Sequence, residues 1–151
     1  MEGFDYKGPY RYLITCCTHL RRELFFDDQT AVETLAQFRI AAAENQFAIL
    51  AYCLMPDHVH LLAEGLAERS DLLRFVRMGK QRAAYSYSKA TGGSRLWQEG
   101  FHDRVLRGDD DIKATAKYVL ENPVRAGLAI SACDYRFCGS DMWTIADILS
   151  A

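Results

Sequence analysis

Two apolar runs separated by a Pro-Asp pair are the stretch that most restricts the fold. Residues 47–55 read FAILAYCLM and residues 58–64 read HVHLLAE, with Pro56 and Asp57 between them. Short apolar runs on both sides of a turn-forming pair are typical of a β-hairpin. The second run, however, carries His58 and His60 where a buried strand usually carries Val or Leu. The hairpin therefore constrains the architecture, and its two imidazoles raise the question of function.

The segments around this hairpin predict a recurring order of strands and helices. We expect further strands at residues 10–18 and 101–106, where aromatic and β-branched residues are frequent. Helical spacing of apolar residues predicts helices whose expected N-caps are Asp27 or Asp28 and Ser70. The predicted helices cover residues 27–46, 70–90 and 109–122, and a short strand at 134–138 and a closing helix at 141–151 follow.

This order, β-α-β-β-α-β followed by one more helix, is typical of an α+β fold of the ferredoxin-like, split βαβ type. We therefore expect a four-stranded antiparallel sheet with two helices on one face and an additional helix that carries Tyr118. The other face of the sheet would be uncovered, which leaves room for a site. A chain of 151 residues is expected to form one domain over residues 1–151.

The composition is that of an ordinary globular protein. No apolar run is long enough to span a bilayer, and the first residues lack the apolar segment of a signal peptide, so we expect a cytoplasmic protein without membrane contact. The five cysteines include no CxxC pair, which argues against a disulfide framework or a zinc ribbon.

The His-x-His pair can bind a metal ion. Alternate side chains of a strand share a face, so His58 and His60 would project together while Val59 points to the other side. Asp57, just outside the strand, can orient one imidazole as a hydrogen-bond acceptor. The alternative is that both histidines are partly exposed polar positions on a half-buried strand.

A distant helix offers a further ligand and a nucleophile. Tyr118 lies about 100° around the helix axis from the apolar position Val119, so it falls off the apolar stripe. Asn122 follows four residues later and would share the face of Tyr118 if the helix is continuous, although Pro123 disfavours helical backbone at that position. Asn supplies a neutral oxygen, and a Tyr phenol can attack as a nucleophile once it is deprotonated. A structural role for Tyr118 at the boundary of the core is the alternative.

Charge is distributed unevenly along the chain. The formal net charge is −2, but residues 69–107 hold nine Lys or Arg against three Asp or Glu. A locally basic surface on a mildly acidic protein fits a polyanionic partner and also fits an ordinary solvated helix. The candidate DNA-binding residues lie on one predicted helix and are Arg74, Arg77, Lys80, Arg82 and Lys89.

Two spaced motifs give the sequence a family resemblance. MPDHVHLL at residues 55–62 is followed by LWQEGFHDRVLRGDDD at 96–111 and by YVLENPVRAGL at 118–128. In this order they resemble the REP-associated tyrosine transposases, a branch of the single-tyrosine HUH endonucleases that also include the IS200-like transposases. The similarity extends from about residue 10 to residue 128.

The resemblance implies an enzyme that nicks and rejoins single-stranded DNA near hairpins. By this resemblance His58 and His60 ligate Mg²⁺ or Mn²⁺, and Tyr118 attacks the scissile phosphate to give a covalent 5′-phosphotyrosine. Insertion-sequence relatives carry Gln, one methylene longer, at the position of the third metal ligand, Asn122. The family includes both homodimers and proteins that act as single subunits, so a monomer and a homodimer both remain open.

Two other classes of function fit the same residues. One is a nucleic-acid-binding module without catalysis, although the aromatic signature of RNA-binding ferredoxin-like sheets is missing from the sequence. The other is a metal-dependent hydrolase that uses water, in which Tyr118 has only a structural role.

Overall fold

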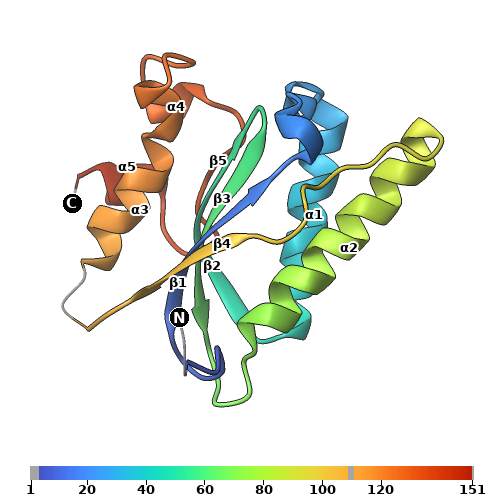
Figure 1. Ribbon diagram of the computed structural model, residues 1–151. Helices are drawn as coiled ribbons and strands as arrows, with labels where there is room; N and C mark the ends of the chain where they lie inside the picture. Colours follow the sequence, from blue (N-terminus) through green and yellow to red (C-terminus); the bar gives the residue numbers. More distant parts are fainter. Residues whose placement is uncertain (1–3, 109–110, 151) are drawn as a thin grey trace.

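An antiparallel five-stranded sheet forms the centre of the computed structural model, which describes residues 4–108 and 111–150 (Figure 1). The strand order is β4-β1-β3-β2-β5, and every neighbouring pair is antiparallel. The first four strands in this order confirm the predicted split βαβ sheet, and β5 adds a short fifth strand beside β2. The strands are β1 (Arg11–Cys17), β2 (Phe47–Met55), β3 (His58–Gly65), β4 (His102–Leu106) and β5 (Cys138–Gly139).

The helices lie on both faces of the sheet (Figure 1). Within the described ranges none of them is long and apolar enough to cross a membrane. Asp109 and Asp110, the first residues of the helix expected at 109–122, lie outside these ranges. The helices are α1 (Asp28–Glu44), α2 (Leu72–Thr91), α3 (Ile112–Leu120), α4 (Asn122–Arg125) and α5 (Ile145–Leu149), with single 3₁₀ turns at His19–Arg21, Leu24–Phe26 and Ala132–Asp134.

The larger core lies between the sheet and the pair α1 and α2. Alternation along β3 turns Val59 and Leu61 into this core. Aromatic rings fill its centre: Phe75 of α2 stacks on Phe47 of β2 with centroids 4.8 Å apart and meets Phe38 of α1 edge-on at 6.3 Å. This core fixes which side chains of β3 face α1 and α2, and His60, between Val59 and Leu61, must face the other way.

A second core covers part of the opposite face, which corrects the expectation that this face is uncovered. Leu62 of β3 and Leu106 of β4 pack there with Val119 and Leu120 of α3. Ile148 of α5 is fully buried in the same cluster. Helix α3 is thus held on the sheet by its own apolar stripe, and the position of Tyr118 relative to the sheet follows from that packing.

Of the two predicted helix caps on α1 and α2, one agrees with the structure and one does not. The closing helix expected at 141–151 is shorter than predicted and spans Ile145–Leu149. Asp27 caps α1 by accepting a hydrogen bond from the Thr30 backbone N–H, as expected. The predicted cap of α2, Ser70, is wrong, since the carboxylate of Asp71 accepts from the Arg74 N–H instead. The Ser70 hydroxyl is engaged elsewhere, donating to the Gln46 carbonyl at 2.8 Å.

Close packing of α1 on α2 generates a stability prediction at Gly79. A methyl group added there would lie 2.5 Å from a ring carbon of the buried Phe38. Gly79→Ala should therefore lower the free energy of unfolding by about 1–3 kcal/mol, the usual cost of overpacking. Helix propensity alone predicts the opposite sign, a gain of about 1 kcal/mol.

Urea denaturation of the two proteins measures the difference. The matched control is Gly108→Ala, where an added methyl meets nothing within 4 Å, and its stability should equal that of the native chain. A stabilised Gly79→Ala variant would show that the two helices are not in the close contact described.

Candidate active site

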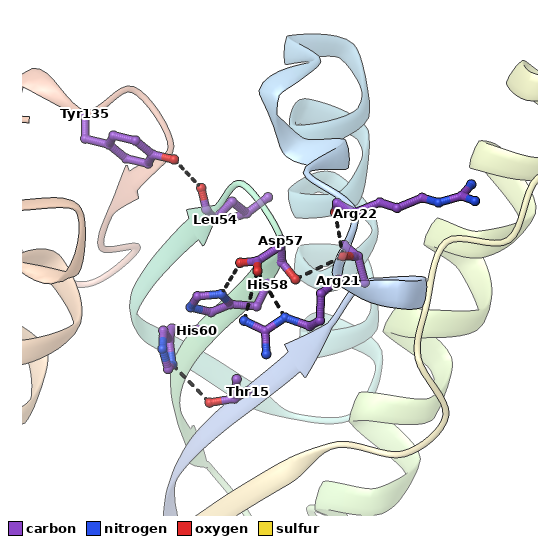
Figure 2. A network of polar contacts seen from close by, with 9 residues as sticks. Thr15, Arg21, Arg22, Leu54, Asp57, His58, His60 and Tyr135 are labelled. Atoms are coloured by element: carbon purple, nitrogen blue, oxygen red, sulfur yellow. Dashed lines mark hydrogen bonds and ion pairs between the residues drawn. The ribbon is translucent and has the colours of Figure 1, made fainter. Parts of the chain in front are cut away.

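His58 and His60 project from the same face of β3, the face that α3 also covers. In the register of the sheet they lie opposite Cys17 and Thr15 of β1, while Val59 enters the core on the other side. The two imidazole rings meet edge-on with their centroids 4.8 Å apart (Figure 2). The predicted side-by-side placement of the histidines is confirmed.

Asp57 orients the first imidazole. Its Oδ1 lies 2.7 Å from Nδ1 of His58, and its Oδ2 accepts a hydrogen bond of 3.0 Å from Nε of Arg21 (Figure 2). Burial alone would raise the pKa of the Asp57 carboxyl, but the hydrogen bonds from His58 and Arg21 outweigh it and lower that pKa. An ionised carboxylate accepts the Nδ1 proton of His58, so Nε2 keeps its lone pair for a ligand.

Thr15 holds the second imidazole, and burial keeps it neutral. The Thr15 hydroxyl lies 3.0 Å from Nδ1 of His60 (Figure 2). Desolvation is the largest cause, followed by electrostatic interactions with His58 and Arg125, and together they lower the pKa of His60 to about 4. His60 is therefore uncharged near neutral pH, which is the state in which an imidazole binds a metal.

Tyr118 lies near the end of α3 with its side chain accessible. The residue is 54% exposed, in contrast to its neighbour Val119, which is 1% exposed in the second core. The guanidinium carbon of Arg125 lies 3.9 Å from the centroid of the Tyr118 ring. Nη2 of Arg125 also donates a hydrogen bond of 2.7 Å to the Tyr118 carbonyl. The ring is therefore held by a cation that stacks on it.

Arg125 and Thr15 are site residues that sequence reasoning did not single out. Arg125 lies beside the tyrosine. Its charge reaches both parts of the site, because it stacks on Tyr118 and also lowers the pKa of His60. A basic residue seven positions after a tyrosine, two helical turns along, was the available signal. The intervening Pro123 made that spacing hard to interpret, since proline usually interrupts a helix.

The helix that carries Tyr118 does not continue to Asn122. It ends at Leu120, and a separate short helix begins at Asn122, with Glu121 (φ −86°, ψ 0°) at the joint. Pro123 has no N–H to donate to the Val119 carbonyl, which accounts for the break. The expectation of one continuous helix is therefore wrong. Among the described residues the buried Nδ2 of Asn122 has no hydrogen-bond partner.

The two imidazoles at this site fit a divalent cation whose remaining ligands are neutral oxygens of the chain or oxygens from outside it. With a proton on each Nδ1, the two imidazoles would leave their Nε2 lone pairs free for a ligand. The unpaired atom of Asn122 is its amide nitrogen, which is a donor, so a ligand from this residue would have to be its Oδ1. In residues 4–108 and 111–150 no three His, Cys, Asp or Glu side chains gather into a metal-binding group. Any third protein ligand at this site would therefore be an amide or hydroxyl oxygen.

The basic residues predicted to bind DNA lie on α2, across the sheet from the histidines. Part of their charge is engaged within the chain. Lys80 donates to the Gln98 and Gly100 carbonyls, Arg82 pairs with Glu44 at 2.7 Å, and Lys89 lies over the Tyr85 ring. DNA contact by Arg74, Arg77, Lys80, Arg82 and Lys89 stays a prediction, and it would involve a surface remote from the tyrosine.

Comparison with known proteins identifies the family. The model of the family described as "Transposase IS200 like" matches residues 8–122. A candidate REP-associated tyrosine transposase of Haemophilus influenzae is 29% identical in an alignment of 134 positions, which covers 82% of this chain and 75% of that protein. The REP-associated tyrosine transposase of Escherichia coli K12 is 28% identical over 97 residues, 62% of this chain and 54% of its own length.

Solved structures agree with the fold. The structure of a REP-associated tyrosine transposase bound to a REP hairpin matches 91% of this chain and 80% of its own, with a TM-score of 0.75 at 21% identity. A candidate transposase from Deinococcus radiodurans matches 81% of this chain and 95% of its own, with a TM-score of 0.54 at 25% identity. The chain belongs to the IS200-like transposase family.

The burial of His60 predicts how stability depends on pH. Its folded pKa of about 4 lies below the unfolded value of 6.5, so the unfolded chain binds more protons between these two values. The free energy of unfolding should therefore fall as the pH drops from 6.5 to 4, by up to about 3 kcal/mol from this residue, and level off below.

Urea titrations of native and His60→Gln protein at several pH values isolate this contribution. The variant should lose less stability than the native chain between pH 6.5 and 4, because Gln does not titrate. Parallel pH profiles for the two proteins would mean that His60 is not desolvated.

Proposed function

We propose that this chain is a metal-dependent endonuclease and strand-transfer enzyme that cuts single-stranded DNA beside a hairpin through a covalent tyrosine intermediate. The observation that carries the proposal is the pair of fixed imidazoles on the sheet face to which the tyrosine helix is packed. Membership of the IS200-like transposase family supports the same chemistry. A hydrolase that uses water would need the histidines, and a binding module would need no catalytic residue. Neither function would need an exposed tyrosine held by an arginine.

His58, His60 and Asn122 are the residues that would hold Mg²⁺ or Mn²⁺. A bound divalent ion supplies charge that neutralises the phosphate and stabilises the departing oxygen. Asp57 and Thr15 keep the two imidazoles in place through their Nδ1 atoms. The low pKa of His60 keeps its ring neutral and available as a ligand across the physiological range.

Tyr118 is the proposed nucleophile. Its phenol loses a proton, the phenolate oxygen forms a bond to the scissile phosphorus, and the bond from phosphorus to the 3′ oxygen breaks. The 3′ oxygen takes up a proton and leaves as a hydroxyl, and the 5′ phosphate stays on the tyrosine. The guanidinium of Arg125 stacks on the ring, which places a positive charge beside the group that attacks the phosphate. The phosphotyrosine can then be resealed by a 3′ hydroxyl.

Attack within one chain is the simplest arrangement. Val119 and Leu120 of α3 are buried against the sheet of the same chain, which keeps Tyr118 beside its own histidine face. A monomer would therefore be sufficient for cleavage, whereas exchange of α3 between two chains would have to expose these residues. Hairpin DNA is the proposed partner because the relatives of similar sequence are named for REP elements, and one solved relative is bound to a REP hairpin.

A covalent adduct is the direct test of the proposed function. The native chain, incubated with Mn²⁺ and a labelled oligonucleotide that carries a hairpin and a single-stranded flank, should yield protein-linked DNA on a denaturing gel. Tyr118→Phe removes only the hydroxyl and should abolish the adduct while circular dichroism stays unchanged. His58→Ala should lower adduct formation by at least about 100-fold, since it removes a ligand.

The alternatives appear as distinct outcomes of the same assay. DNA cut by the Tyr118→Phe variant would indicate a water mechanism. Binding of the oligonucleotide without any cleavage by the native chain would indicate a module without catalysis.

Arg125 generates a separate kinetic prediction. Arg125→Gln should slow adduct formation by about 10-fold or more, because the Tyr118 ring loses the cation that stacks on it. Arg125→Lys, which keeps the charge, is the matched variant and should retain more activity. Equal rates of adduct formation for the native chain and the Gln variant would remove Arg125 from the mechanism.

A further inference from the structure

A hollow of about 440 Å³ opens beside Tyr118, on the side of α3 that faces the β4 edge of the sheet. Its walls come from three elements that are distant in sequence: β1, β4 and the outer face of α3. The lining residues are Leu13, Arg104, Asp111, Ala114, Thr115 and Tyr118. The volume falls in the range that accommodates small ligands, and the proposed nucleophile forms part of its wall.

The register of the sheet places this hollow on the histidine face. Leu13 of β1 pairs with Arg104 of β4, and Leu13 lies two residues before Thr15, the hydrogen-bond partner of His60. Residues two apart on a strand share a face, so Leu13, Arg104 and the His60 ring lie on one side of the sheet. A strand of DNA that reached Tyr118 from the β4 edge would therefore cross the hollow before it reached the histidines.

Arg104 places a positive charge at the wall of this hollow. The residue is exposed, and it takes part in none of the ion pairs or side-chain hydrogen bonds found within the described ranges. Other arginines on the same side are engaged: Arg11 pairs with Glu64 at 2.5 Å, and Arg125 stacks on Tyr118. An exposed guanidinium that faces a hollow without a carboxylate partner is suited to bind a phosphate.

The remaining lining residues suit the uncharged part of a nucleotide. Leu13 and Ala114 supply apolar surface for a sugar or the face of a base. Asp111 is acidic, but its carboxylate caps α3 by accepting hydrogen bonds of 3.0 and 3.1 Å from the Lys113 and Ala114 N–H groups. These N–H groups offset part of its charge, so the field at Arg104 remains favourable for an anion.

We propose that this hollow is a nucleotide subsite in which Arg104 binds a phosphate of the single strand adjacent to the one that Tyr118 attacks. The inference rests on the proposed function, since it takes single-stranded DNA as the ligand. It places the DNA path along the β4 edge on the tyrosine side of the sheet, whereas the basic face of α2 lies on the other side.

Salt dependence of binding tests this assignment without cleavage. Affinity of the full-length chain for the hairpin oligonucleotide is measured by fluorescence anisotropy in EDTA at several salt concentrations. Arg104→Gln should bind about 10-fold more weakly, and its plot of log K against log salt should be shallower by about 0.7, the contribution of one single-strand phosphate contact. Arg104→Lys keeps the charge and should keep the slope.

A matched control separates this contact from a general loss of charge. Arg22→Gln removes the same charge from an exposed residue whose side chain points away from the histidines (Figure 2), and it should leave the slope unchanged. A second series replaces one phosphate linkage of the flank at a time by a neutral methylphosphonate. One linkage should weaken binding by the native chain and have no effect on Arg104→Gln.

The outcomes distinguish the subsite from the proposed chemistry. The subsite would be overturned if Arg104→Gln had the same salt slope as the native chain, or if the neutral linkages weakened both proteins equally. The proposed chemistry would be unaffected by that result if the native chain still formed the covalent adduct. DNA binding with the expected change in slope but no adduct from the native chain would overturn the chemistry and leave the subsite. A native chain that does not bind the oligonucleotide at all would overturn both.

Discussion

Pairing of β3 with β1 is the interaction on which both the core and the candidate site depend. The register that places Thr15 opposite His60 also places Cys16 opposite Val59, so one set of backbone hydrogen bonds decides which side chains are buried. A slip of one residue would turn both imidazoles into the core between the sheet and α1 and α2, and would turn Val59 out. The burial of Val59 and Leu61 therefore also keeps the histidines on the opposite face of the sheet.

The fold was largely predictable because its signals are local. Apolar runs on both sides of a turn-forming pair located the hairpin at residues 47–64, and helical spacing located α1 and α2, so the ferredoxin-like order followed from the sequence. The second core was not foreseen, since Leu62, Val119 and Ile148 come from segments whose contact no local pattern specifies. The prediction of the α2 cap was wrong for a related reason. Ser70 and Asp71 are both good N-cap residues, but the Ser70 hydroxyl donates to the distant Gln46 carbonyl.

The candidate site was predictable only as far as it lies within single elements. His58, His60 and the orienting carboxylate of Asp57 follow one another in sequence, so strand periodicity was enough to join them. Thr15, which holds His60, comes from β1, and its role depends on a register that the sequence does not state. Arg125 and the joint at Glu121 depend on how the backbone turns around Pro123, where helical spacing no longer predicts which side chains meet.

The stacked Tyr118–Arg125 pair has a consequence for how such a site can be moved during evolution. Both the ring and the guanidinium belong to one stretch of eight residues, and the arginine also grips the backbone carbonyl of the tyrosine. The proposed nucleophile and a positive charge beside it thus lie within one short segment of the chain. The rest of the molecule has only to provide an apolar surface on which Val119 and Leu120 pack, at the right distance from a pair of imidazoles.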